Sequence, residues 1–233
     1  MSKQKTYSPH ELEYLRLLGK EYPTEQDAAT EIINLNAILN LPKATEHFMS
    51  DVHGEYEAFV HVMNSASGAI REKIEDLFAD ELSSEERETL ATIIYYPEQK
   101  IAELLPDVED EKTFYYDTLN HLIELTLVIT SKFTRSKGRK ALPQEYAYVI
   151  DELINIDFDL HNKKDYYDNI LNTIIDIGKG LDFIVAVCGV IKRLSVDRLH
   201  LVGDVFDRGP RADIIMDELM KHHSLDFQFG SHD

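Results

Sequence analysis

Cysteine is almost missing from this 233-residue sequence, since Cys188 is the only one. An intrachain disulfide is therefore excluded, which fits a protein of a reducing compartment. Long apolar runs are missing too, because none approaches the roughly 18 to 20 residues that a membrane span needs. Residues 1–15 contain no apolar stretch that could act as a signal peptide. We therefore expect a cytoplasmic protein.

Basic residues are scarce as well. Lysine and arginine number 24 against 43 aspartates and glutamates, which gives a formal net charge of -19. A field of this sign repels nucleic acid and anionic lipid, so the sequence predicts neither nucleic acid nor a membrane as a partner. It also repels a phosphate ester, unless cations are concentrated where the ester binds. A bound divalent metal ion would supply that positive charge.

Hydrophobic periodicity divides the sequence into a helical part and an α/β part. Residues 1–45 are predicted to form a helical N-terminal segment, with one helix starting at 24–27. Residues 46–67 and 197–233 are predicted to form an α/β core, with strands at 47–51, 198–202 and 225–229. The connections around the later strands are short and helical, which predicts parallel strands. Residues 68–196 are predicted to be an all-helical insertion.

Three details of the helical part can be checked against a structure. The segment 83–86 has the pattern of a capping box. A further helix is predicted over 143–154 because a proline opens it. A long amphipathic stretch at 114–133 is predicted to bury one face, made of Leu119, Leu122, Ile123 and Leu127.

Three short polar motifs follow the three predicted strands: Asp51-Val52-His53, segment 203–209 (GDVFDRG) and segment 230–233 (GSHD). Sites in open α/β sheets form at the carboxyl ends of strands, so these motifs are expected to lie together. Asp51 and His53 are two residues apart, and in an extended segment their side chains point the same way. A carboxylate and an imidazole aimed together suit a divalent ion such as Mn, Fe or Zn. The alternative for this common pattern is a solvated loop.

Segment 203–209 is the more specific of the motifs. Asp204 at a strand end can bridge two metal ions, and Asp207 can orient a nearby histidine. Arg208 offers a planar fork of donors that matches phosphate oxygens. The flanking glycines allow a sharp turn and a close approach to a ligand. The alternative is an acidic turn with an exposed arginine.

Together the motifs resemble the signature of calcineurin-like metallophosphoesterases, which is Asp-x-His, then Gly-Asp-x-x-Asp-Arg-Gly, then Gly-Asn-His. The resemblance implies that Asp51 and His53 hold a first metal ion and that Asp204 bridges two ions. Ser231 stands where the family has asparagine, whose amide oxygen is a good neutral ligand. A serine hydroxyl is shorter, so we expect Ser231 to be a weak metal ligand.

The same resemblance implies catalytic roles for three side chains. Asp207 would pair with His232, and His232 would donate a proton to the leaving oxygen. Arg208 would bind substrate by clamping the phosphoryl group.

The long helical segment between the first two motifs narrows the resemblance to class III fructose-1,6-bisphosphatases of Gram-positive bacteria. Local stretches with the same resemblance are LPKATEHFMSDVHGEYEAF, TSKFTRSKGRKALP and LHLVGDVFDRGPRADIIMDELMKHHS. The implied fold class is α/β: a partial metallophosphoesterase α/β sandwich with a large all-helical insertion and a helical N-terminal segment. The implied activity is hydrolysis of fructose 1,6-bisphosphate to fructose 6-phosphate and phosphate in gluconeogenesis, with manganese (Mn2+) at a two-metal site.

The family continues beyond the third motif with more sheet and two further histidine ligands, whereas this sequence stops at Asp233. We therefore expect a truncated N-terminal fragment with an incomplete second metal site and impaired turnover. The unpaired edge of the last strand would favour pairing with another chain. An oligomer, or a full-length homologous chain, is thus an expected partner beside a phosphorylated sugar substrate.

Two other functions remain open. One is a metallophosphoesterase that acts on phosphoproteins or nucleotides, although the long helical segment argues against it. The other is a non-catalytic fragment that binds a full-length partner.

Two basic features lie outside the motifs. The basic island at 132–140 is either an anion site, for substrate or a phosphorylated effector, or a solvated loop between helices. His222 and His223 end a predicted helix, where a cation suits the helix dipole.

Overall fold

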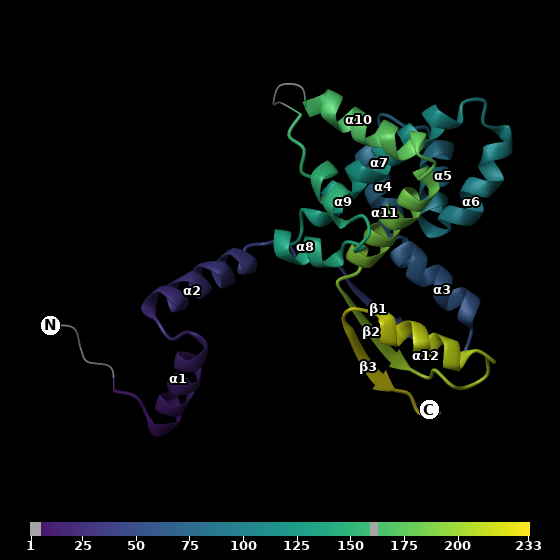
Figure 1. Cartoon of the computed structure of the whole chain (residues 1–233). Helices are drawn as coiled ribbons and strands as arrows, with labels where there is room; N and C mark the ends of the chain where they lie inside the picture. The colour runs from purple at the N-terminus through teal and green to yellow at the C-terminus, as the bar shows by residue number, and fades with distance from the viewer. Residues whose placement is uncertain (1–5, 159–162) are drawn as a thin grey trace. The chain divides into compact units, whose positions relative to one another are not determined.

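The structure is a computed structural model that describes residues 6–158 and 163–233 (Figure 1). The chain divides into two compact units, Met1–Pro42 and Lys43–Asp233. Within the described residues, no helix is both long enough and apolar enough to cross a bilayer.

The described part of the first unit forms helices α1 (Pro9–Glu21) and α2 (Glu25–Leu39). Thr24 caps α2 by accepting the N–H of Asp27, whose carboxylate accepts the N–H of Thr24 in return. This reciprocal pair satisfies two backbone donors, and it confirms the helix start predicted at 24–27. Over their described residues, neither α1 nor α2 buries a side chain.

The second unit contains a sheet of three strands in the order β1 (Glu46–Ser50), β2 (Arg198–Gly203) and β3 (Leu225–Phe229). All strands run parallel, as predicted, and Ser50 lies opposite Val202, which lies opposite Gln228. Their carboxyl ends therefore meet at one edge of the sheet.

Helices α3 (Tyr56–Ser65) and α12 (Ala212–Lys221) pack with the sheet through a small apolar core. The buried members of this core are Val52, Phe59, Leu199, Leu201, Val205, Ala212, Ile215 and Leu219. Along the strands burial alternates, so that Phe48 and Val202 on the opposite face are 68% and 37% exposed. One face of the sheet is thus covered by helices, and the other presents apolar side chains to solvent.

The remaining elements of the second unit are helical and share a separate, larger core. They are α4 (Ala69–Phe78), α5 (Ser84–Tyr95), α6 (Pro97–Leu104), α7 (Glu111–Thr130), α8 (Arg135–Ala141), α9 (Ala147–Leu153), α10 (Lys163–Asp176) and α11 (Gly180–Ser195), with short 3-10 turns at Ala66–Gly68 and Leu105–Asp107. The α/β class is therefore confirmed, with most of the chain helical. Cys188 lies fully buried in this core, and burial raises the pKa of its thiol to about 12.

Two details of the helical prediction need correction. Leu119, Leu122 and Ile123 of α7 are buried as predicted, but Leu127 is 47% exposed because the buried stripe continues through Thr126 and Ile129 instead. The helix predicted over 143–154 begins later, at Ala147. Pro143 instead opens a turn, in which its carbonyl accepts the N–H of Tyr146 at 3.2 Å. The predicted capping box at 83–86 is confirmed, with Ser83 as the cap.

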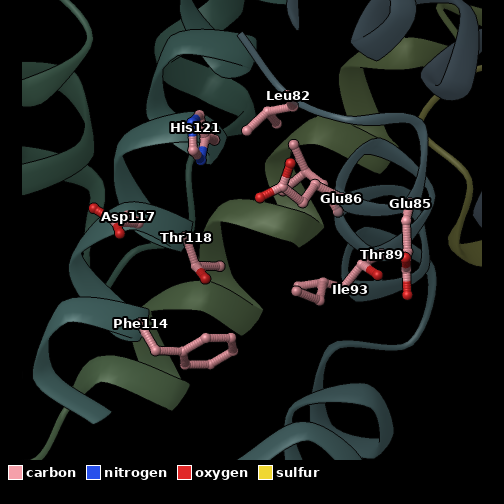
Figure 2. A pocket seen from close by; sticks show the side chains of 10 residues that line it. Leu82, Glu85, Glu86, Thr89, Ile93, Phe114, Asp117, Thr118 and His121 are labelled. Atoms are coloured by element: carbon pink, nitrogen blue, oxygen red, sulfur yellow. The ribbon is translucent and has the colours of Figure 1, made fainter. Parts of the chain in front are cut away.

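Helices α5 and α7 leave an open pocket of about 410 Å³ between them (Figure 2). Its apolar floor includes Ile93 and Phe114, and its rim carries Glu85, Glu86 and Asp117. The pocket is acidic and lies in the helical part, away from the strand ends that carry the motifs.

Candidate metal centre

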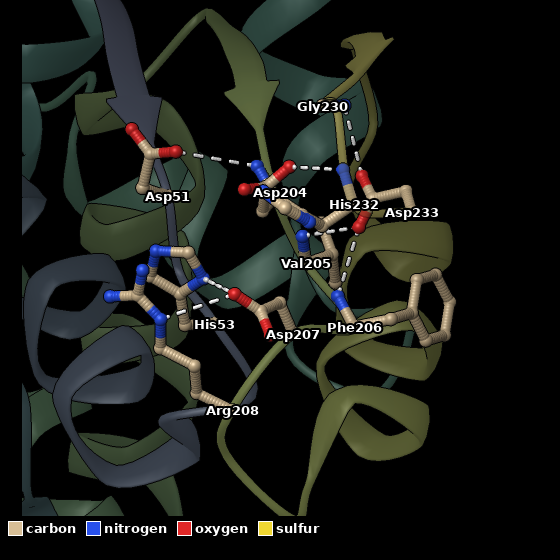
Figure 3. A network of polar contacts seen from close by, with 10 residues as sticks. All are labelled: Asp51, His53, Asp204, Val205, Phe206, Asp207, Arg208, Gly230, His232 and Asp233. Carbon is tan, nitrogen blue, oxygen red and sulfur yellow. Dashed lines mark hydrogen bonds and ion pairs between the residues drawn. The ribbon is translucent and has the colours of Figure 1, made fainter.

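The three motifs come together where the parallel strands end (Figure 3). The loop after β1 carries Asp51 and His53, the loop after β2 carries Asp204, and the loop after β3 is the segment 230–233. Backbone hydrogen bonds join the first two loops: Asp51 donates its N–H to the carbonyl of Val202, and His53 donates to that of Asp204. The sheet register therefore extends into the loops and fixes their relative position.

Asp51, His53 and Asp204 form a compact set of metal-ligating side chains. One ligand atom of each lies within 4.8 Å of the others. Asp204 is buried, His53 is half-buried and Asp51 is exposed, so the set opens to solvent on one side. The Nδ1 atom of His53 is buried and lacks a hydrogen-bond partner among the described residues. Two carboxylates and an imidazole with an unsatisfied nitrogen fit a divalent ion such as Mn, Fe or Zn.

The backbone of these loops holds an unusual conformation. Asp51, His53 and Arg208 have φ angles of 52°, 49° and 77°, in the left-handed region that costs a residue with a side chain free energy. Gly54 and Gly209 are in direct backbone contact, since a Cβ added to Gly54 would lie 2.4 Å from the Gly209 carbonyl oxygen. Strained residues persist only where their surroundings fix them, and here the two packed loops do so.

Asp207 lies beside His53 and Arg208. Its Oδ2 is 3.8 Å from Nδ1 of His53 and accepts a hydrogen bond from Nε of Arg208 at 3.1 Å. The predicted pair of Asp207 with His232 is not among the contacts of the described residues. The reason is geometric: the Asp207 carboxylate turns toward the β1 loop, whereas His232 belongs to the β3 loop (Figure 3). Arg208 keeps 71% of its side chain exposed, so most of its donors remain free.

The β3 loop is held to the β2 loop mainly by Asp233, a residue to which the sequence analysis gave no role. Its side-chain carboxylate accepts the N–H groups of Val205 at 2.7 Å, Phe206 at 3.0 Å and Gly230 at 3.0 Å. These donors, with Phe206 first, hold the pKa of the Asp233 carboxyl below its ordinary value. The sequence signal for this contact is an acidic residue three positions after Gly230, the glycine that follows β3.

His232 and Ser231 lie in the same turn and are exposed. The backbone N–H of His232 donates to Oδ1 of Asp204 at 2.9 Å, which fixes the buried carboxylate from the β3 side. Gly230 makes this approach possible, because a Cβ there would lie 2.0 Å from Oδ1 of Asp204. The structure thus brings every predicted site residue to one edge of the sheet.

Basic side chains of the island at 132–140 are engaged with acceptors elsewhere. Lys137 pairs with Asp197, and Nε of Arg139 lies 3.4 Å from Oδ2 of Asp151. These pairs favour the interpretation of the island as a solvated, structural feature.

Comparison with known proteins identifies the family. The sequence profile described as Firmicute fructose-1,6-bisphosphatase matches residues 13–233. Fructose-1,6-bisphosphatase class 3 of Clostridium novyi is 56% identical over 223 residues, which cover 96% of this chain and 34% of that protein. The enzyme of the same name from Clostridium acetobutylicum is 55% identical over 222 residues, covering 95% of this chain and 33% of its own length.

This chain therefore spans about a third of the length of the curated relatives that it matches. No solved structure matches it. The profile match and the identities agree with the motifs at the strand ends, and the chain belongs to the Firmicute fructose-1,6-bisphosphatase family.

Proposed function

We propose that this chain carries part of the active site of a metal-dependent phosphatase that hydrolyses fructose 1,6-bisphosphate to fructose 6-phosphate and phosphate. The observation that carries the proposal is the convergence of Asp51, His53 and Asp204 at the carboxyl edge of a parallel sheet. Its relatives are named fructose-1,6-bisphosphatase class 3, which supports the sugar bisphosphate as substrate. The reaction belongs to gluconeogenesis in the cytoplasm.

The metal centre holds Mn2+ in this proposal. Asp51 and His53 would hold a first ion, Asp204 would contribute to both ions, and Ser231 would be a weak ligand of the second. When bound as a pair, such ions activate the attacking water and stabilise the leaving oxygen. The exposed side of the set, at Asp51, is where a substrate oxygen would enter.

The side chains around the centre have separate tasks. Arg208, largely exposed and anchored by one bond to Asp207, directs its free donors at the phosphoryl oxygens. His232 donates the proton to the leaving oxygen, and its backbone bond to Asp204 ties it to the centre. Asp207 orients Arg208 and His53 rather than His232, in line with its contacts.

The domain organisation that we propose follows the same family. Residues 46–67 and 197–233 belong to a metallophosphoesterase α/β sandwich, residues 68–196 are its helical insertion, and 1–45 is a helical N-terminal segment. The uncovered sheet face with Phe48 and Val202 supports a further layer, because parallel sheets are normally covered on both faces. Another part of the protein, or a homologous chain, would supply that layer.

The experiment is phosphate release from fructose 1,6-bisphosphate by the purified protein with excess manganese. Asp204→Asn keeps the shape of the side chain and removes its charge, so release should fall by at least about 100-fold, the scale expected when a metal ligand rather than its support is lost. Asp80→Asn, an exposed carboxylate in the helical part, is the matched control and should keep full activity.

The alternatives predict different results in the same assay. Release from phosphoserine peptides or nucleotides, with none from the sugar bisphosphate, would favour another metallophosphoesterase. No release from any of these substrates by folded protein, together with its recovery in complex with a full-length homologous chain, would favour a non-catalytic partner.

A further inference from the structure

A second pocket lies at the opposite end of the sheet from the metal centre. It has a volume of about 430 Å³ and lies where α11 and α12 end. Val196, in its wall, precedes β2, and His222 and His223 precede β3. The metal ligands follow the carboxyl ends of the strands, whereas this pocket lies at their amino ends. It shares no residue with the site already described.

The charge of this pocket is opposite to that of the chain. Lys192, Arg193 and Lys221 line it against one carboxylate, Glu218, which pairs with Lys221 at 2.8 Å. In the described part of the chain, neither Lys192 nor Arg193 forms an ion pair or a side-chain hydrogen bond. Burial lowers the pKa of Lys192, and the carboxylate of Glu98 opposes this shift without forming an ion pair, so the ammonium group is partly withdrawn from water. A chain with a net charge of -19 thus places two basic side chains without an ion pair in one concave place.

We propose that this pocket binds a small phosphate-bearing ligand, held by Lys192 and Arg193 with His222 and His223 as hydrogen-bond donors. The assignment goes beyond the proposed phosphatase reaction, because it uses none of the residues placed in that reaction. A volume of about 430 Å³ suits a ligand the size of a phosphorylated metabolite.

The two histidines are arranged to respond to such an anion. Their rings stack with centroids 4.5 Å apart, so two imidazolium charges there would repel each other. Burial and the nearby Arg193 guanidinium lower the pKa of both residues. Nδ1 of His222 is already bonded to the carbonyl oxygen of Ser224 at 2.8 Å, so this ring can donate to a phosphate only through Nε2 and only when it is protonated. A phosphate between these rings and the two basic side chains would offset the repulsion and favour that protonated form.

Helix ends alone do not account for this arrangement. Lys192 and Lys221 lie in the last turns of α11 and α12, where a cation suits the helix dipole. The helix dipole favours a nearby positive charge, but it explains neither a pocket nor two stacked histidines that line it. Pocket, charge and rings together indicate a ligand.

The test uses metal-free protein, so that the metal centre contributes no phosphate site. Inorganic phosphate and pyrophosphate are titrated by calorimetry, while the imidazole C–H signals of His222 and His223 are followed by NMR. We expect saturable binding with movement of both histidine signals. The double variant Lys192→Gln/Arg193→Gln should bind at least tenfold more weakly.

The matched control is Lys73→Gln/Lys132→Gln, which removes the same charge from a different pocket that also holds Glu72 and Asp76. It should change the affinity by less than twofold. An equal loss in both double variants would mean a general charge effect and would overturn the proposal. Histidine signals of the unaltered protein that stay still during the titration would overturn it as well, whether or not the variants fold.

Discussion

The helical core around α7 and α11 differs from the three-stranded sheet in how completely its buried side chains are packed and hydrogen-bonded. The helical core buries large residues such as Phe78 and Phe183 completely. The buried side-chain nitrogens that lack a hydrogen-bond partner in the described part of the chain lie instead in the sheet, at His47 and His200, and in the loop after β1, at His53. Strained φ angles also gather at the strand ends. Most of the stability therefore comes from the helical core. The unsatisfied polar atoms, which can bind a ligand, lie in the sheet and in the loop after β1.

Breaking the helical core should have the largest effect on folding. Phe183 is fully buried and packs edge-on against Tyr146, with ring centroids 5.2 Å apart. Phe183→Ala leaves a cavity and should lower the free energy of unfolding by about 3–5 kcal/mol, measured by urea denaturation followed by circular dichroism. Tyr148→Ala, at a position 78% exposed, should change it by less than about 0.5 kcal/mol. Similar losses in the two variants would contradict the division of roles.

The contact between the β1 and β2 loops can be broken without touching a ligand. Gly54→Ala adds about 1–2 kcal/mol of left-handed strain and about 1–3 kcal/mol of overpacking against Gly209. Gly68→Ala provides the control, since its φ is also positive, at 90°, but nothing lies within 4 Å of the added Cβ. In thermal unfolding, the melting temperature should fall clearly more for Gly54→Ala than for Gly68→Ala. An equal fall in both variants would contradict the close contact between the β1 and β2 loops.

Removing one ligand should lower metal affinity while leaving the helical core intact. Asp51→Asn is expected to weaken Mn2+ binding by at least about 100-fold, or about 2.8 kcal/mol, as measured by electron paramagnetic resonance of free Mn2+. The melting temperature of the metal-free protein should not change, because Asp51 is exposed. The exposed control Asp80→Asn should bind normally. Unchanged affinity in Asp51→Asn would remove this residue from the centre.

The smallest expected effect concerns a helix cap. Ser83→Ala removes the side-chain oxygen that accepts the N–H of Glu86 and should cost about 1 kcal/mol. The neighbouring Ser84→Ala lies at the first helical position and makes no such bond, so it should be nearly neutral. Denaturation midpoints that fall equally in both variants would contradict the role of the cap.

Features that depend on nearby residues could be predicted from the sequence. The capping pairs of Ser83 and Thr24 follow from residues three positions apart, and both form. The strands and their parallel order follow from short apolar runs separated by helical connections. The motifs at 203–209 and 230–233 lie at the same edge for the same reason.

Features that depend on long-range packing could not. Leu127 fits the helical period of α7 but is exposed, because burial depends on where the neighbouring helices lie. The partner of Asp207 is set by the left-handed turn at Arg208, which brings the β2 loop against His53. The anchoring role of Asp233 likewise appears only when the β2 and β3 loops meet. No periodic pattern encodes such contacts.

The pairing of β1 with β2 also constrains the order in which segments of the chain can fold during synthesis. Strand β1 ends at Ser50 and pairs with β2, which begins at Arg198. At a synthesis rate of about 5–20 residues per second, β1 leaves the ribosome roughly 7–30 s before its partner exists. Most of the helical core is synthesised in that interval, and its folding would shorten the free length of the long connection and so lower the entropy cost of pairing β1 with β2. The helical core thus has time to form during translation before β2 can pair with β1.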